Sequence, residues 1–170
     1  MFMIRITCLC LALALMWGCG NGGNEELAVF PLEDAKGTLA TDVAVTDTVE
    51  KAEGEASLRI DADKAMTVTL MEIDSIDLEN ATLLYEATLK SKGMDSGAYL
   101  EMWCVFSGLG EYFSRGLQDP VTGDTDWTTV ATPFFLKQGQ NPDLVRLNLV
   151  LNGPGTVWID HIRLLNAPLK

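Results

Sequence analysis

The sequence predicts an all-β fold, an antiparallel β-sandwich, that follows a cleaved N-terminal signal helix. From Leu58 onward, several segments alternate apolar and polar residues, which is the pattern of strands with one buried face. Turn signals rich in Gly, Asn, Pro and Asp separate these segments. No clear helical stretch follows the N-terminal apolar run. A parallel α/β fold would need crossover helices, so the strands are expected to be antiparallel.

Residues 1–18 have the composition of an export signal. Arg5 precedes an apolar run from Ile6 to Trp17, which is too short to cross a hydrocarbon core that needs roughly twenty helical residues. Gly18 and Cys19 follow directly, and this order resembles the bacterial lipoprotein signal. The resemblance implies a diacylglycerol on the Cys19 thiol and a further acyl chain on its amine after cleavage. The alternative is an ordinary cleaved signal in which Cys19 is incidental.

The same resemblance implies a location in the bacterial cell envelope, with the protein held to a membrane by its lipid. Because Gly20 rather than Asp follows Cys19, a Gram-negative cell would send it to the outer membrane. Residues 19–26 would form the lipidated cysteine and a flexible Gly, Asn and Glu tether. Residues 27–170 would then form a single β-sandwich domain.

The charge balance excludes one class of partner. The chain holds 12 Lys and Arg against 24 Asp and Glu, and only Arg5 among these lies in the signal, which leaves a net charge of −13 after cleavage. Such a surface repels phosphate backbones, so we expect no nucleic-acid partner. Anionic membrane surfaces are also repelled, so membrane attachment would depend on the lipid.

The cysteines predict neither a disulfide framework nor a reactive thiol. Cys8 and Cys10 lie in the signal and Cys19 would be acylated, which leaves Cys104 without an intramolecular partner. No charged neighbour in the sequence would stabilise a thiolate at Cys104, so we expect it to fill a core position.

Seven segments carry the strand pattern: 56–63, 65–73, 81–90, 97–106, 128–137, 144–151 and 156–165. Lys92 and Gly93 are predicted to form a turn between the third and fourth. Residues 107–125 show no clear alternation and are predicted to form a long loop over the sandwich.

The C-terminal half is similar to the closing strands of the galactose-binding-like jelly roll, a β-sandwich shared by many carbohydrate-binding modules. The similarity is carried by TDWTTVATPFFL, DLVRLNLVLNG and GTVWIDHIRLL, and GEASLRI resembles an early strand of the family. It implies binding of a carbohydrate or another polyhydroxylated ligand without catalysis. It also implies that Trp127 and Trp158 are core anchors.

The final motif contains a predicted bulge and a candidate metal ligand. Strict alternation would separate Ile159 from Ile162, whereas a bulge near Asp160 would return both to the core. In the related modules the corresponding aspartate often ligates a structural calcium ion. The resemblance therefore implies Asp160 as a Ca²⁺ ligand, with Glu33 or Asp34 as a further oxygen donor. The alternative is that Asp160 caps a bulge amide and no metal binds. No other cofactor is expected.

Alternation places five polar or aromatic side chains on the outer faces of two strands: Tyr99, Glu101, Trp103, Arg146 and Asn148. Aromatic rings cover sugar C–H faces while charged and amide groups bind hydroxyls, so these residues are the predicted ligand-binding face. The alternative is that Trp103 and Tyr99 lie beneath a long loop.

Tyr112 and Arg115, in the predicted 107–125 loop, are further candidate ligand contacts. Phe113 and Leu117 of the same loop could instead fold back onto the core.

Two other functional classes remain open. The sandwich could dock onto an envelope protein as a structural or assembly lipoprotein, with Tyr99 and Trp103 in that interface. A weaker alternative is a glycoside hydrolase that uses Glu101 and Glu111 as its acid and base. The motifs of serine hydrolases, zinc proteases and phosphate-binding loops are absent from the sequence.

Overall fold

The computed structural model describes residues 24–169 and confirms the all-β prediction. Apart from one short 3-10 helix, η1 (Ala35–Gly37), the regular elements of these residues are strands. Within residues 24–169, no helix combines the length and the apolar character needed to cross a bilayer. The signal segment and Cys19 lie outside the described residues.

Nine strands make up the fold: β1 (Glu25–Phe30), β2 (Ala44–Asp47), β3 (Ser57–Ala62), β4 (Met66–Asp74), β5 (Ala81–Phe106), β6 (Gly110–Arg115), β7 (Val121–Leu136), β8 (Leu144–Leu151) and β9 (Gly155–Ala167). All strand pairings are antiparallel. β1 includes Glu25 and Glu26, the last two residues of the predicted tether, because they pair with the end of β9.

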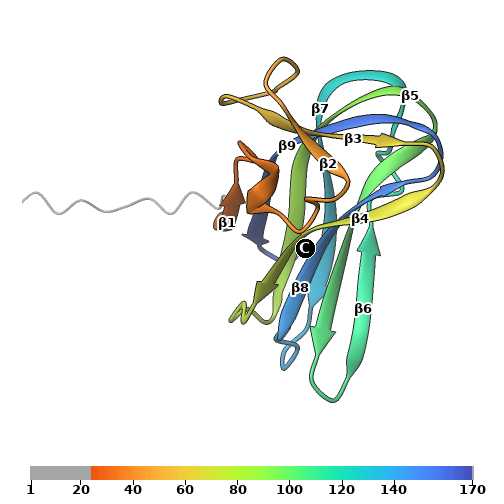
Figure 1. Ribbon diagram of the computed structural model, residues 1–170. Helices are drawn as coiled ribbons and strands as arrows, with labels where there is room; N and C mark the ends of the chain where they lie inside the picture. Colours follow the sequence, from red (N-terminus) through yellow and green to blue (C-terminus); the bar gives the residue numbers. More distant parts are fainter. Residues whose placement is uncertain (1–23, 170) are drawn as a thin grey trace, which may run out of the picture.

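The strands form one curled sheet whose two layers face each other across the core (Figure 1). The first layer holds β2, β3, β9, the first half of β5 and β7, with β1 also paired to β9. The second layer runs β4, β8, the second half of β5, and β6. β4 and β6 are therefore the edges of the second layer.

Strand β5 belongs to both layers. Its residues 82–92 pair with β9, and its residues 98–105 pair with β8. The change of layer occurs where Gly93 and Gly97 have φ values of +62° and +80°, which glycine adopts without steric cost. The predicted turn at Lys92 and Gly93 is thus a bend within one long strand, and Gly155 of β9 lies against it.

The predicted bulge in β9 is confirmed. Thr88 of β5 pairs with Asp160 of β9, but Glu86 pairs with Arg163, so β9 has one extra residue in this interval. His161, which lies in the interval, has a φ of +49°. Val157, Ile159, Ile162 and Leu164 are all fully buried as a result.

The core lies between the layers and includes the apolar faces predicted for the third and fourth segments. Cys104 is among its members, as expected, and burial raises the pKa of its thiol to about 12, so it stays protonated at neutral pH. Trp127 and Trp158, however, are not core anchors, because they are absent from this cluster. Trp158 stands between the inward residues Val157 and Ile159, so it points to the outer face of the first layer.

We predict that Tyr85→Phe stabilises the protein. The hydroxyl of Tyr85 is fully buried and has no hydrogen-bond partner among the described residues, and an unpaired buried hydroxyl costs free energy. The free energy of unfolding, measured with urea, should rise by about 1 kcal/mol. Tyr112→Phe is the control, because that exposed hydroxyl donates to the carbonyl of Leu109 and should contribute little. A loss of stability in Tyr85→Phe would show that the hydroxyl has a partner.

Candidate functional site

The outer face of the second layer is the candidate site. Register pairs Glu101 of β5 with Asn148 of β8 and with Arg115 of β6, which places the three side chains in one row across three strands. The next row holds Trp103, between Arg146 of β8 and Phe113 of β6. We call these six residues, Glu101, Trp103, Phe113, Arg115, Arg146 and Asn148, the β5–β8 face.

The centre of the β5–β8 face is the carboxylate of Glu101. This residue is only 4% exposed, although it lies on the outer side of the layer. Its Oε1 accepts hydrogen bonds from Trp103 Nε1 at 2.8 Å and Asn148 Nδ2 at 3.0 Å, and its Oε2 accepts one from Arg115 Nε at 2.6 Å. These three donors satisfy a charge that would otherwise be costly to bury.

The ionisation of Glu101 reflects this balance. Burial raises the pKa of its carboxyl, but the hydrogen bonds from Arg115, Asn148 and Trp103 and the positive charge of Arg115 together outweigh burial and leave the pKa below its ordinary value. Glu101 is therefore a carboxylate at neutral pH, fixed as an acceptor. Its role is to orient the three donors around it.

Asn148 has an unused hydrogen-bonding group. Its Nδ2 donates to a carboxylate that can only accept, which fixes the orientation of the amide. Its Oδ1 is buried and has no partner among the described residues. This acceptor lies beneath the surface of the β5–β8 face, next to the central charge, and solvent does not reach it.

An aromatic pair lies beside this polar network. The rings of Trp103 and Phe113 are 5.0 Å apart between centroids, and the Arg115 guanidinium lies 4.4 Å from the centroid of the Phe113 ring. Phe113 is 50% exposed, and Trp103 is half-buried. Solvent therefore reaches apolar ring surface next to charged hydrogen-bonding groups.

The remaining predicted residues of this face differ in exposure. Arg146 is half-buried and its Nε donates to Glu72 of β4 at 2.8 Å, so it belongs to a partly exposed ion pair. Tyr99 shares the outward side of β5, but only 7% of it is exposed, opposite Val150 of β8. Tyr99 therefore lies beneath the surface at one end of the face.

The predicted loop over residues 107–125 is wrong. Residues 110–115 form β6, and β7 already begins at Val121. The alternation of β6 sends Arg115 and Phe113 to the β5–β8 face but sends Tyr112 to the opposite side, where its ring lies 6.1 Å from that of Phe106. Tyr112 therefore lies away from the other predicted ligand contacts. Phe113 and Leu117 do not fold onto the core, because both are exposed.

The carboxylates of Asp160 and Glu33 both accept hydrogen bonds from the loop of residues 52–56. Asp160 Oδ2 accepts the amides of Ala52 and Glu53 at 2.9 and 3.0 Å, and its Oδ1 accepts the amide of His161 in the bulge. Glu33 Oε2 accepts the amides of Glu55 and Ala56 at 2.8 and 2.9 Å.

A calcium ion would bind the carboxylate oxygens, and those of Asp160 together with Oε2 of Glu33 already accept hydrogen bonds from backbone amides. Among residues 24–169, no group of three or more acidic, histidine or cysteine side chains gathers in a form that could hold a metal. The donors present fit a loop clamp, as in the bulge-capping alternative, and not a calcium shell. The calcium site stays a prediction.

Glu101 and Glu111 are poorly placed for glycoside hydrolysis. Glu101 pairs with Arg115 and Glu111 pairs with Val105, so the two glutamates are offset by four residues, about 13 Å along the strands. Glycosidase carboxyl groups are separated by about 5–10 Å. The lowered pKa of Glu101 also opposes a role as general acid, which requires a raised pKa.

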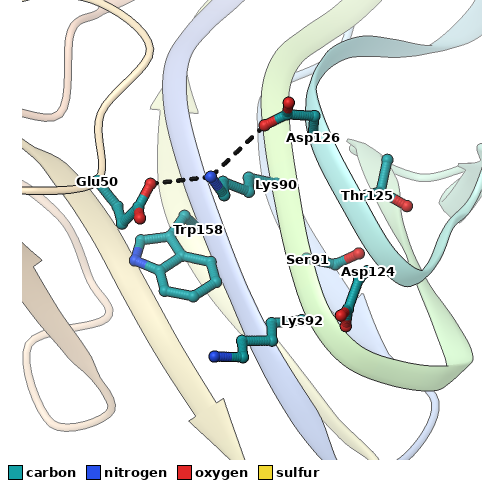
Figure 2. A pocket seen from close by; sticks show the side chains of 8 residues that line it. All are labelled: Glu50, Lys90, Ser91, Lys92, Asp124, Thr125, Asp126 and Trp158. Atoms are coloured by element: carbon teal, nitrogen blue, oxygen red, sulfur yellow. Dashed lines mark hydrogen bonds and ion pairs between the residues drawn. The ribbon is translucent and has the colours of Figure 1, made fainter.

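A hollow lies on the outer face of the first layer, and no sequence pattern predicts it. Figure 2 shows this trough of about 490 Å³, between β5, β7, β9 and the loop that precedes β3. The Lys90 side chain extends across the trough, and its Nζ lies 2.9 Å from Glu50 Oε2 and 3.5 Å from Asp126 Oδ1. Trp158 is 8% exposed, and its Nε1 already donates to Asp47. The Lys90 ammonium in the trough is already paired with two carboxylates, and Trp158 leaves little aromatic surface accessible there.

We predict that Glu101→Gln destabilises the protein at neutral pH. The neutral glutamine amide cannot form the charge-assisted hydrogen bond to Arg115, and its NH₂ group would face the N–H groups that now donate to the carboxylate. The free energy of unfolding should therefore fall by about 2 kcal/mol. Because the folded pKa of Glu101 lies below its ordinary value of 4.5, the wild-type advantage is present above pH 4.5 and is lost as pH falls through the folded pKa. Urea unfolding across this range measures it.

The matched control for that measurement is Glu72→Gln, which removes an exposed carboxylate from Arg146 and should cost less than about 1 kcal/mol. Equal losses in the two variants would contradict the central role of the Glu101 carboxylate.

Comparison with known proteins supports the fold. No protein-family model matches the chain, and a search of curated proteins finds no match. Among solved structures, the chain is similar to the CBM22-1 xylan-binding domain of Paenibacillus barcinonensis Xyn10C, with a TM-score of 0.57 and 9% identity over 88% of this chain and 99% of that domain.

Two further structures give the same picture. The CBM22-1–GH10 modules of Clostridium thermocellum Xyn10B, complexed with xylohexaose, match with a TM-score of 0.59 and 12% identity over 85% of this chain and 29% of that one. A family 16 carbohydrate-binding module matches with a TM-score of 0.53 and 13% identity over 75% of this chain and 89% of that one. The chain therefore has the jelly-roll β-sandwich fold seen in these carbohydrate-binding modules.

Proposed function

We propose that this protein is a non-catalytic module that binds a carbohydrate on the β5–β8 face. The observation that carries the proposal is the aromatic pair of exposed Phe113 and half-buried Trp103 beside a fixed network of hydrogen-bonding groups. A sugar presents apolar C–H faces and hydroxyl groups at once, so it requires this combination of surfaces.

The network supports binding in a second way. Glu101 fixes Asn148 and Arg115 before any ligand arrives, which reduces the entropy lost on binding. The partly exposed guanidinium of Arg115 is available as a donor for the hydroxyl groups of a ligand. The xylan-binding domain described above shares only the fold with this chain. We propose glycan binding for this chain because of the residues on its β5–β8 face.

We further propose that the mature chain is anchored in the bacterial cell envelope through lipid on Cys19. The support is the order of Arg5, the apolar run and Gly18–Cys19 in the sequence. β1 begins at Glu25, so only a few residues would separate the lipid from the folded domain.

Binding should depend on Phe113 and not on its neighbour Tyr112. The two are 50% and 52% exposed on the same strand, but their rings lie on opposite sides of the layer. We expect Phe113→Ala to weaken binding of xylohexaose, or of the glycan that an array selects, at least tenfold (~1.4 kcal/mol), and Tyr112→Ala to change it less than about twofold. Isothermal titration calorimetry measures both.

The pair of variants also separates the competing functional class. If the array gives no binding and a single envelope protein is captured in a Phe113-dependent manner, the face is a protein interface and the carbohydrate proposal is wrong. Equal losses from Phe113→Ala and Tyr112→Ala would place the binding site elsewhere.

Lipidation has its own test. Cells that express the full chain and are fed an alkyne-tagged fatty acid should label the wild type, and Cys19→Ser should lose the label, because the thiol is the acceptor. Cys104→Ser is the control and should keep it, since Cys104 is buried in the folded domain. A label that survives in Cys19→Ser would contradict the anchor.

A further inference from the structure

Strand β6 leaves a row of backbone groups without partners. Gly116 N donates to Leu100 O, so in the alternation of an antiparallel ladder Ser114 and Tyr112 also bond to β5. The N–H and C=O groups of Glu111, Phe113 and Arg115 therefore point away from β5, at the edge of the layer. No hydrogen bond to them is formed within residues 24–169.

This edge is held rigidly and is accessible. The Ser114 hydroxyl contacts Thr132 Oγ1 at 2.7 Å and Pro133 O at 2.5 Å, which fixes β6 to β7 without using its outward backbone groups. In Figure 1, β6 lies at the outer side of the molecule with no strand beyond it. A rigid edge loses little entropy when another strand pairs with it.

The other edges are protected by different devices. β4 receives a hydrogen bond from Leu39 N at Leu70 O. β7 contains Pro133 and three register shifts, β1 has a bulge between Glu26 and Ala28, and β2 has only four residues. Such features discourage strand addition. β6 has six residues, no proline and a regular register.

The sequence of β6 is complementary to itself. In an antiparallel pair of two β6 strands centred on Phe113, Glu111 of each copy lies opposite Arg115 of the other, on the side of the β5–β8 face. Arg115 uses its Nε for Glu101, and its terminal nitrogens form no hydrogen bond with any residue from 24 to 169, so they can bind the second carboxylate. Phe113 of one copy would lie opposite Phe113 of the other, which adds an aromatic cross-strand pair.

We propose that two copies of this chain associate through antiparallel pairing of their β6 strands, centred on Phe113. The pairing joins the second layers of both copies into one continuous sheet. It sets the two β5–β8 faces side by side on the same surface, so a ligand of extended form could contact both. The association itself follows from the edge and does not depend on the proposed carbohydrate binding.

Sedimentation equilibrium of the full chain over a wide range of concentration tests the pairing. The mass should rise from 18.5 kDa toward twice that value. Glu111→Lys places a cation opposite Arg115 of the second copy, and Glu111→Pro removes an outward N–H group. Each should weaken association at least about tenfold.

Glu55→Lys is the matched control. It makes the same charge change on the loop that precedes β3, away from β6, and should associate like the wild type. All variants keep residues 1–24, so any association through that segment is common to them. Circular dichroism checks that each variant retains its strands. If the mass of the wild type and of the three variants depends on concentration in the same way, the proposal is wrong, whether or not glycans bind.

Cross-linking tests the register. Residue 113 faces itself across the two-fold axis in a hydrogen-bonded pair, with Cα atoms about 5.5 Å apart, which is within disulfide range. Phe113→Cys should therefore form a disulfide-linked dimer on mild oxidation. All chains in this test carry Cys8→Ser, Cys10→Ser and Cys19→Ser, and neither this background alone nor Val49→Cys, at an 85% exposed position, should form such a dimer. A Phe113→Cys chain that cross-links no faster than Val49→Cys would exclude this register.

Discussion

The carboxylate of Glu101 is the constraint on which the outer side of the second layer depends. It is a charge with 4% exposure on a strand whose opposite side, Leu100 and Met102, forms the core. Burial of this charge is tolerable only if donors surround it, and β8, β6 and β5 each supply one. The same three bonds that satisfy the charge also fix Trp103, Asn148 and Arg115 in place. Stability and the shape of the face thus have one cause.

Strand β5 makes this arrangement possible. Its first half completes the first layer with β9 and β7, and its second half forms the middle of the second layer. The two outer surfaces are therefore chemically different. The first-layer trough near Trp158 contains the ion pairs of Lys90, whereas the β5–β8 face keeps an exposed aromatic ring beside the partly exposed guanidinium of Arg115. The trough provides volume, whereas the β5–β8 face provides the accessible aromatic and hydrogen-bonding groups.

Alternation predicted most of the fold because inward and outward residues of an amphipathic strand follow a period of two. It correctly placed Tyr99, Glu101, Trp103, Arg146 and Asn148 on one side of the sheet, and the bulge at Asp160 followed from the need to bury Ile162. It missed β6, because in GEYFSR the residues on both sides are exposed and no apolar side marks the strand. Phe113 was therefore missed and Tyr112 was chosen. The hydrogen-bond partner of Trp158 is Asp47, at the end of β2 and far from it in the sequence, and no local pattern predicts such a contact.

The most direct test of the account is an NMR titration of the indole N–H signals with xylohexaose, or with the glycan that an array selects. Trp103 Nε1 binds the Glu101 carboxylate within the β5–β8 face, and Trp158 Nε1 binds Asp47 beside the trough, so the two signals report on different surfaces. If a carbohydrate binds the β5–β8 face, the Trp103 signal should shift saturably while the Trp158 signal stays unchanged. A shift of the Trp158 signal with Trp103 unchanged would contradict it.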